Sequence, residues 1–348
     1  MNRIDLNSAP WREFDYPRLL ETGLAGEWPA GSGYFTVEEI PLYPFSGDGE
    51  HAALSVEKVD MTTRDLALAV ADALGVGGAA VGYAGMKDRD AVTLQAFTIT
   101  GVDEEKAARA FTEAGAKVIS ATRHRNKLRL GHLAGNRFLV RLRGGDIESA
   151  SKALEELTRL GLPNYFGPQR FGARGDNARE GYRFLAGEVR RKKVGRWKRD
   201  LIISALQSLL FNEVLARRIE AGDFRRVISG DLLKKHDSGG IFISEEVEVD
   251  QPRLDSFEVS PTGPIFGKKM KSPEGAIAEA ERGVLDDFGL AEELFGRETG
   301  SRKELRAPVA GASASEWDEG VELTFTLMPG VYATSLVREI AKSGVFRV

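Results

Sequence analysis

The chain has 348 residues, a formal net charge of −4, no cysteine and four histidines. This length favours about two domains, and the lack of cysteine excludes disulfides, thiol catalysis and cysteine-ligated zinc. The histidines form no cluster of metal-binding spacing, no apolar run approaches the roughly 18 residues of a membrane helix, and the first residues lack the apolar core of a signal peptide. We therefore expect a cytoplasmic protein with no metal site and no membrane partner.

The predicted elements mix helices and strands without a regular strand–helix alternation, which indicates an α+β fold. Three helices have a capping residue directly before them, namely Thr62, Asp103 and Asp146. A long helix is predicted to open at Asp200 and to close at Gly222. In chain order, the predicted helices cover about 63–74, 104–115, 147–160, 201–221 and the residues from about 334, and the predicted strands cover 79–83, 93–99, 118–120, 138–142 and 321–327.

Positive charge is concentrated in two blocks, each with seven Lys or Arg and no acidic residue, at 121–145 and 189–199. The second block also contains Trp197. Such segregation predicts a basic face that binds a phosphate backbone, although two solvated charge runs would have the same composition. The cations that we expect at an RNA backbone are Lys87, Arg123, Arg125, Lys127, Arg129, Arg190, Arg191, Lys192 and Lys193.

Residues 82–95 place Asp88 between Lys87 and Arg89, in a turn between two predicted strands. Flanking positive charge should lower the pKa of the Asp88 carboxyl group. An ionised aspartate in a loop suits nucleophilic attack or charge stabilisation better than proton donation. A polar turn without any chemical role would look similar.

Two further segments have residues suited to RNA. Asn136 follows a glycine-rich turn, and its amide can both donate to and accept from the edge of a nucleobase, although asparagine is also a common turn residue. Residues 163–172 contain three aromatic residues and Arg170 between turn-forming residues. This segment is interpreted either as an RNA contact or as an aromatic plug at a domain junction.

Residues 85–95 resemble the Gly-x-Lys-Asp-x-x-Ala-x-Thr-x-Gln signature of the TruD family of tRNA pseudouridine synthases. The resemblance continues, in the family's order, through 127–138, 163–172, 204–212 and 327–339. It implies a pseudouridine synthase-like catalytic domain with a mixed, largely antiparallel sheet, formed by 1–160 together with 305–348. It also implies an inserted α/β TRUD domain at 161–304.

The resemblance assigns a role to five residues. Asp88 matches the family's catalytic aspartate, and Tyr34, Asn136, Phe138 and Tyr332 match its substrate-binding positions. The implied reaction isomerises uridine 13 in the D arm of tRNA to pseudouridine without a cofactor, with tRNA as the partner of a monomeric protein. Whether Asp88 attacks the ribose or the base is left open.

The sequence departs from the family pattern at 27–33. The family commonly has a basic residue followed by Pro-x-Asp there, as a candidate ion-pair partner for the aspartate, whereas this chain has Trp28 or a neighbour at that place. We expect Lys87 or Arg18 to pair with Asp88 instead, or the pairing to be weaker. The departure also leaves open a non-catalytic RNA-binding protein of the same fold, an RNA chaperone. An acid/base hydrolase would need a second carboxylate opposite the first, for which Asp90 is the nearest candidate.

Overall fold

The computed structural model describes residues 16–21, 23–172, 174–189 and 194–341. The predicted RNA contacts at 190–193 therefore lie outside the described residues. Within these ranges, no helix is long and apolar enough to cross a membrane.

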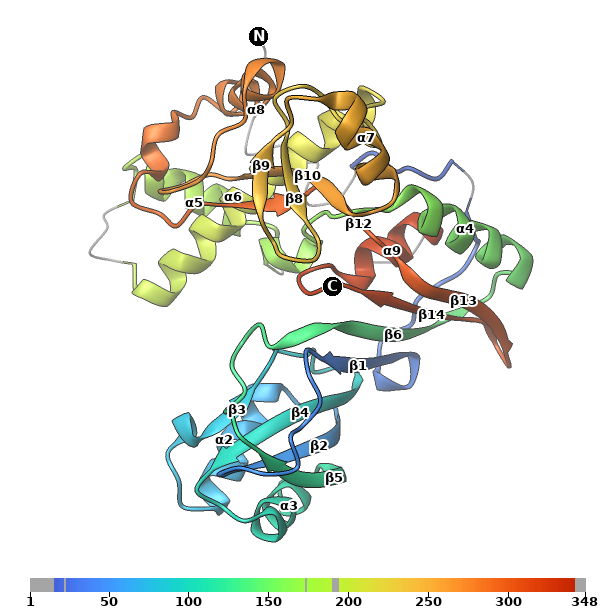
Figure 1. The fold of residues 1–348 in the computed structure, drawn as a ribbon, viewed down its shortest axis with the longest axis vertical. Coiled ribbons are helices and arrows are strands. Elements are labelled where there is room, and N and C mark those ends of the chain that lie inside the picture. The colour runs from blue at the N-terminus through green and yellow to red at the C-terminus, as the bar shows by residue number, and fades with distance from the viewer. Residues whose placement is uncertain (1–15, 22, 173, 190–193, 342–348) are drawn as a thin grey trace.

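An eight-stranded sheet forms the body of the larger part of the molecule (Figure 1). Among the strand pairs of this sheet that the structure describes, β1 and β4 are parallel and the others are antiparallel. The predicted mixed, largely antiparallel sheet is therefore confirmed. In order across the sheet, the strands are β13 (Ala310–Trp317), β14 (Gly320–Leu327), β6 (Leu133–Arg143), β1 (Phe35–Pro41), β4 (Val92–Thr100), β2 (His51–Val59) and β5 (Lys117–His124), with β3 (Val81–Tyr83) paired to β4.

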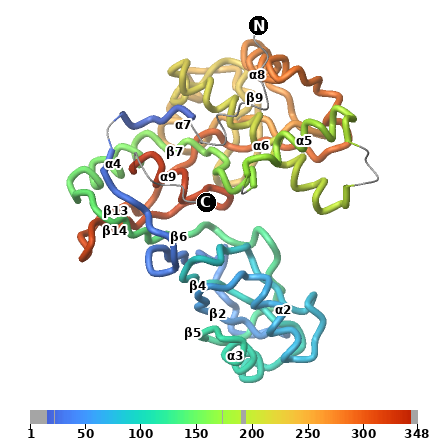
Figure 2. The backbone as a smooth tube through the Cα atoms, turned by 180° about the vertical axis from the view of Figure 1, so that it is seen from behind, coloured from blue at the N-terminus to red at the C-terminus, as the bar shows by residue number. Residues whose placement is uncertain are grey.

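One row of paired residues crosses five strands, and directly paired residues share a face of a sheet. The row consists of Lys58, Thr93, Val37, Phe138 and Phe325. Apolar residues of the same parity pack against helices at both ends of this face. The helices are α2 (Thr63–Ala73) and α3 (Glu104–Glu113) at the β5 end, and α4 (Ile147–Leu160) and α9 (Ala333–Ile340) at the β13 end. Figure 2 shows α2 and α3 at the bottom of the molecule and α4 and α9 higher up, above β13 and β14.

The three predicted N-caps are confirmed. The side chains of Thr62, Asp103 and Asp146 each accept a hydrogen bond from the backbone N–H three residues later, at 3.1, 2.8 and 2.7 Å. The predicted strand at 118–120 is longer, because β2 pairs with residues 117–124.

The long helix α6 (Arg196–Glu220) starts before Asp200, with Gly195 as its N-cap, so the predicted start is wrong. Positive charge at a helix N-terminus is unfavourable, but acids from outside the helix offset it here. Lys198 pairs with Glu180 at 2.9 Å, and Arg199 pairs with Glu298 at 2.8 Å.

The inserted part lies above the sheet in Figure 1 and has its own apolar core, centred on α6. It also contains α5 (Asn177–Leu185), α7 (Val247–Asp255), α8 (Gly275–Asp287) and an antiparallel sheet of β11 (Ser301–Glu304), β10 (Val259–Ile265), β8 (Leu232–Lys235) and β9 (Ile241–Ile243). A short ribbon of β7 (Leu162–Pro163) and β12 (Arg306–Ala307) joins the two parts. The predicted boundaries after 160 and 304 adjoin this ribbon, and we retain them as our proposed division.

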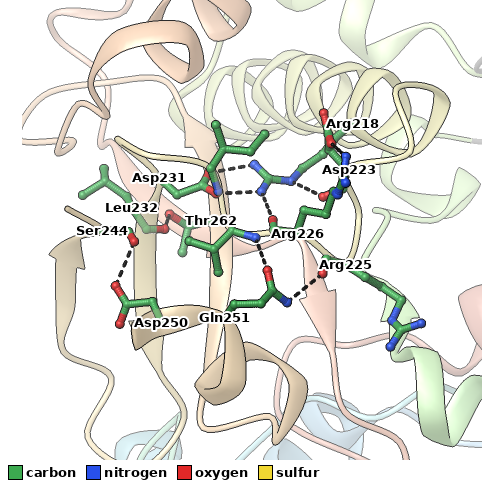
Figure 3. A network of polar contacts seen from close by, with 12 residues as sticks. Arg218, Asp223, Arg225, Arg226, Asp231, Leu232, Ser244, Asp250, Gln251 and Thr262 are labelled. Carbon is green, nitrogen blue, oxygen red and sulfur yellow. Dashed lines mark hydrogen bonds and ion pairs between the residues drawn. The ribbon is translucent and has the colours of Figure 1, made fainter. Parts of the chain in front are cut away.

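A polar network in the insert has Arg218 and Asp231 at its centre (Figure 3). The two side chains form a bidentate ion pair with both distances at 2.7 Å, and Asp231 is fully buried. Arg218 also donates to the carbonyls of Asp223 and Arg226, at 3.1 and 2.7 Å. The pair thereby holds the chain that leaves α6 against β8.

We expect Asp231→Asn to lower the free energy of unfolding by about 3–5 kcal/mol, because it leaves the Arg218 charge buried without its counter-ion. Urea unfolding followed by circular dichroism measures this change. The matched control is Arg183→Met, which removes the exposed Arg183–Glu188 pair and should cost about 0–1 kcal/mol. Equal unfolding midpoints for the two variants would contradict the prediction.

Candidate active site

The middle of the helix-covered face lies between the two helix pairs and is polar and aromatic. Parity and register place Phe35, Val37 and Glu39 of β1 on this face, together with Asn136 and Phe138 of β6. Lys58, Thr93 and Gln95 complete it from β2 and β4. The loop that carries Asp88, residues 84–91, is bound to this surface.

Buried side chains hold the Asp88 loop at four points. The contacts are Gln95 Nε2 to the Gly85 carbonyl (2.6 Å), the Lys87 N–H to the Thr63 hydroxyl (3.0 Å), Lys87 Nζ to Glu39 Oε2 (2.5 Å), and Lys58 Nζ to the Asp88 carbonyl (3.2 Å). The Thr63 hydroxyl in turn donates to Gln95 Oε1 at 2.9 Å. The Lys and Gln of the signature therefore fix the backbone that positions Asp88.

The glycine of the signature, Gly85, lies against the ion pair that holds the loop. A Cβ atom at this residue would lie 2.8 Å from Lys87 Nζ and 3.5 Å from Glu39 Oε2. A side chain here would require the Lys87 ammonium group to shift within its ion pair with Glu39.

The pKa of the Asp88 carboxyl group is raised, so the predicted lowering is wrong. Asp88 is exposed to solvent on one side, but desolvation by the surrounding protein is the largest influence on its pKa, and Asp90 raises it further. Lys58 is the strongest opposing influence, ahead of Lys87. Lys87, which is ion-paired with Glu39, is the smallest of the four influences on the pKa of Asp88.

Lys58 is the cation that the sequence analysis did not identify. Its side chain is fully buried and donates to the Met61 carbonyl at 2.7 Å and to the Thr93 hydroxyl at 3.5 Å. Burial lowers the pKa of Lys58 to about 8, while Asp88 opposes this lowering. Among the described residues Lys58 makes no direct ion pair, so Asp88 is its main electrostatic partner.

The two cations that we expected beside Asp88 have other partners. The Lys87 side chain is buried in its ion pair with Glu39, which leaves it no access to an RNA backbone. Arg18 Nη1 donates to the carbonyls of Arg338 and Ala341, at 2.7 and 3.3 Å.

Asn136 and Phe138 lie on the same face as the Asp88 loop. Asn136 pairs in register with Glu39, the residue that binds Lys87. Its amide Oδ1 is buried and has no hydrogen-bond partner in the described part of the chain. The Phe138 ring lies between those of Phe35, at 6.0 Å and 2°, and Phe325, at 5.5 Å and 30°. An unpaired buried acceptor beside stacked aromatic rings is suited to a planar ligand that carries an N–H donor.

Tyr34 is not brought to this cluster. Its ring meets that of Trp317 edge-on at 6.0 Å, and its hydroxyl accepts from Arg143 Nη2 at 2.7 Å. Phe35 contacts Phe138 instead. Phe35, Val37 and Glu39 of β1 therefore share the site face, so the aromatic residue there is Phe35, one residue later than the expected Tyr34.

Tyr332 is the N-cap residue of α9 and is 39% exposed. Desolvation raises the pKa of its phenol, Arg170 lowers it and Asp88 raises it. The Tyr332 side chain is therefore within electrostatic reach of both Asp88 and Arg170. Its ring lies 6.2 Å from that of Phe166, in the insert.

Most of the described cations of the first basic block are bound by acidic side chains or by a backbone carbonyl. Arg123 pairs with Glu104 at 2.8 Å, Arg125 pairs with Asp48 at 2.6 Å, and Lys127 donates to the Ala79 carbonyl. Arg129 has no such contact among the described residues. On the outer face of β6, opposite the site, Arg137, Arg141 and Arg143 pair with Glu38, Glu322 and Glu319.

Sequence parity contained a signal for the missed residues. Lys58 follows Ala52, Leu54 and Val56 at alternate positions of one strand, and Glu39 follows Phe35 and Val37 in another. A charged residue at the end of an apolar alternation is expected to face the core or a site.

Comparison with known proteins agrees with the fold. The family profile "tRNA pseudouridine synthase D (TruD)" matches residues 21–192 and 191–340. A tRNA pseudouridine synthase D of Anaeromyxobacter sp. is 43% identical over 318 residues, which cover 89% of this chain and 90% of the relative. That of Thermus thermophilus is 40% identical over 343 residues, which cover 97% and 95%. A solved structure from Methanosarcina mazei with the same family name has a TM-score of 0.75 at 23% identity, and the match covers 95% of this chain and 96% of that one.

The matches and the fold define an enzyme, an isomerase of the pseudouridine synthase class. The chain belongs to the tRNA pseudouridine synthase D (TruD) family.

Proposed function

We propose that the chain converts uridine 13 in the D arm of tRNA to pseudouridine, with Asp88 acting on a flipped-out uridine and without a cofactor. One observation carries this proposal: the loop that holds Asp88 is fixed to the sheet face that presents Asn136 Oδ1, which has no hydrogen-bond partner among the residues that the structure describes. We further propose that the protein acts on tRNA as a monomer.

The reaction is an isomerisation that balances without an oxidant or a reductant. The N1–C1′ bond breaks, a C5–C1′ bond forms, the hydrogen on C5 leaves as a proton, and N1 gains a proton. The Asp88 carboxylate supplies a nucleophile for either the ribose or the base. The positive charge of Lys58 favours the ionised carboxylate of Asp88 and so opposes the rise in its pKa that desolvation causes.

A uridine in a stem must leave the base stack before a side chain can reach its glycosidic bond. We propose that uracil N3–H donates to Asn136 Oδ1 and that Asn136 Nδ2 donates to a uracil carbonyl. The ring of Phe138 and that of Tyr332 would contact the base or its ribose. Phe35 takes the role that we had expected for Tyr34. Of the predicted RNA-backbone cations that the structure describes, Arg129 has no competing contact with another described residue, and the residues at 190–193 lie outside the described part of the chain.

The rate should depend on pH at both ends of the profile. Lys58 is charged below its pKa of about 8, so we expect the single-turnover rate to fall as the pH rises through about 8. On the acid side, Asp88 is protonated at a higher pH than an ordinary aspartate because its pKa is raised. As the pH is lowered, the rate should therefore begin to fall at a pH above the usual pKa range of an aspartate. In Lys58→Arg, the guanidinium stays charged, so the alkaline fall should move to higher pH. The same alkaline fall in both proteins would contradict the role of Lys58.

Tritium release from tRNA labelled at uridine C5 tests the proposed reaction, because the C5–H bond breaks when uracil is reattached. We expect one tritium per tRNA from a transcript with uridine 13, and none when cytidine replaces uridine 13. The same assay distinguishes the enzyme from the non-catalytic alternative, since an RNA chaperone of this fold would bind tRNA and release no tritium. Tritium release that persists when uridine 13 is replaced would refute uridine 13 as the target nucleotide.

A further inference from the structure

A second positively charged cluster lies in the insert, next to Tyr332. Arg170, in the short helix η3 (Pro168–Phe171), and Lys303, in β11, are both placed over the ring of Phe166. The guanidinium carbon lies 5.4 Å and the ammonium nitrogen 5.1 Å from the ring centroid. Neither cation forms an ion pair within the part of the chain that the structure describes.

The floor of this cluster is rigid. The Asn212 side chain accepts from the Phe166 N–H and donates to the Phe166 carbonyl, both at 2.9 Å. The Phe211 ring packs edge-on against Phe166 at 5.3 Å. Because both backbone groups of Phe166 are bound, its ring holds the two cations at defined positions.

Both cations keep donors available. Arg170 uses Nε to bind the Ser208 hydroxyl at 3.1 Å, and its Nη groups have no partner among the described residues. Lys303 Nζ makes one long hydrogen bond, to the Gly330 carbonyl at 3.3 Å. Burial lowers the pKa of Lys303 to about 7. Two half-buried cations without a direct ion pair in the described part of the chain are costly, and a bound anion would relieve that cost.

The cluster adjoins the site through Tyr332. The Phe166 ring lies 6.2 Å from the Tyr332 ring, and Lys303 binds the carbonyl two residues before Tyr332. Arg170 and Asp88 both influence the pKa of the Tyr332 phenol. A uridine that reaches Asp88 would therefore have its own backbone close to these cations.

We propose that Arg170 and Lys303 bind a phosphate that directly flanks the target uridine, with the Arg170 Nη groups and Lys303 Nζ as donors. This proposal rests on the proposed function, because it takes Asp88 and Asn136 as the uridine site. A planar guanidinium fork and a point-charge ammonium are suited to one phosphate group. The alternative is that both cations only pack against Phe166.

Binding in an Asp88→Asn background tests the proposal without turnover. The probes are tRNA with normal phosphates and tRNA with a neutral methylphosphonate at one of the two phosphates that flank uridine 13. We expect Arg170→Gln to weaken binding of normal tRNA about 10-fold or more and to reduce the slope of log Kd against log salt by about one. One of the two methylphosphonates should weaken binding to the Arg170 protein and have little further effect on Arg170→Gln.

Arg282→Gln is the matched control, because Arg282 is an exposed arginine on α8, at the end of the insert distant from the sheet (Figure 1). It should leave both Kd and the salt slope unchanged. Arg170→Lys and Lys303→Met test the same phosphate with a retained or a removed charge, and circular dichroism verifies that each variant is folded.

An unchanged Kd and salt slope in folded Arg170→Gln would overturn the proposal, as would a methylphosphonate penalty that is equal with and without Arg170. Failure of the Asp88→Asn protein to bind normal tRNA would also overturn it. A wild-type enzyme that releases no tritium would refute the proposed function alone, since the binding comparison does not depend on turnover.

Discussion

Asp88→Asn should lower the single-turnover rate of pseudouridine formation by about 10⁴-fold or more, on the order found when a nucleophile is removed. The loop should stay in place, because its contacts use the Asp88 carbonyl rather than the side chain. We therefore expect the Kd for tRNA to change by less than about 3-fold, well below 1.4 kcal/mol. Tritium release measures the rate, and filter binding measures the Kd.

Asp90→Asn is the matched control for this prediction. Asp90 is exposed, lies two residues away and raises the pKa of Asp88. Its replacement should move the acid limb of the pH profile to lower pH and keep the rate at neutral pH within about 10-fold. Equal losses in the two variants would instead favour a pair of carboxylates acting together, as in a hydrolase.

Lys58→Met should lower the rate by about 10²–10³-fold, because it removes the buried charge that favours ionised Asp88. The substitution should change the free energy of unfolding much less than the activation free energy of the reaction, because the charged form of a buried lysine is itself unfavourable at neutral pH. Because the pKa of Lys58 is lowered in the folded protein, the cost of burying its charged form is largest below about pH 8. This cost is relieved as the pH rises above that value. Single-turnover rates and urea unfolding, measured on the same preparation, separate the two effects.

Lys106→Met is the control for charge removal, because Lys106 is an exposed lysine on α3 with a side chain that is 68% exposed. Its rate should equal that of the wild type. A wild-type rate in folded Lys58→Met would contradict this role of Lys58 and show that another cation favours the ionised form of Asp88.

Local features of the fold were predictable from the sequence, because they depend on neighbouring residues. The caps Thr62, Asp103 and Asp146 bind backbone groups only three residues away. The start of α6 was not predictable in this way, because Glu180 and Glu298, which offset its positive N-terminus, lie far along the chain.

The same limit applies to charge and to register. The arginines of the first basic block look unpaired in the sequence, yet Arg141 meets Glu322 through a strand pair that only the fold creates. Asp88 and Asn136 could be selected from motifs, but whether Tyr34 or Phe35 faces the site depends on strand parity. A shift of one residue turns a side chain to the opposite face.

The electrostatic interaction between Asp88 and Lys58 shows why the departure at 27–33 was misleading. The sequence suggested a missing cation upstream of Tyr34, whereas the structure places a buried cation on β2, beside the Asp88 carbonyl. Two residues that are 30 positions apart in the chain meet because β2 and β4 are neighbours in the sheet.

The most direct measurement is to incubate the protein with several unmodified tRNA transcripts and to map pseudouridine by carbodiimide treatment and primer extension. We predict one new stop, assigned to uridine 13 in the D arm, that is absent with Asp88→Asn. No new stop in the D arm of any transcript, with folded protein that binds tRNA, would contradict the proposed function.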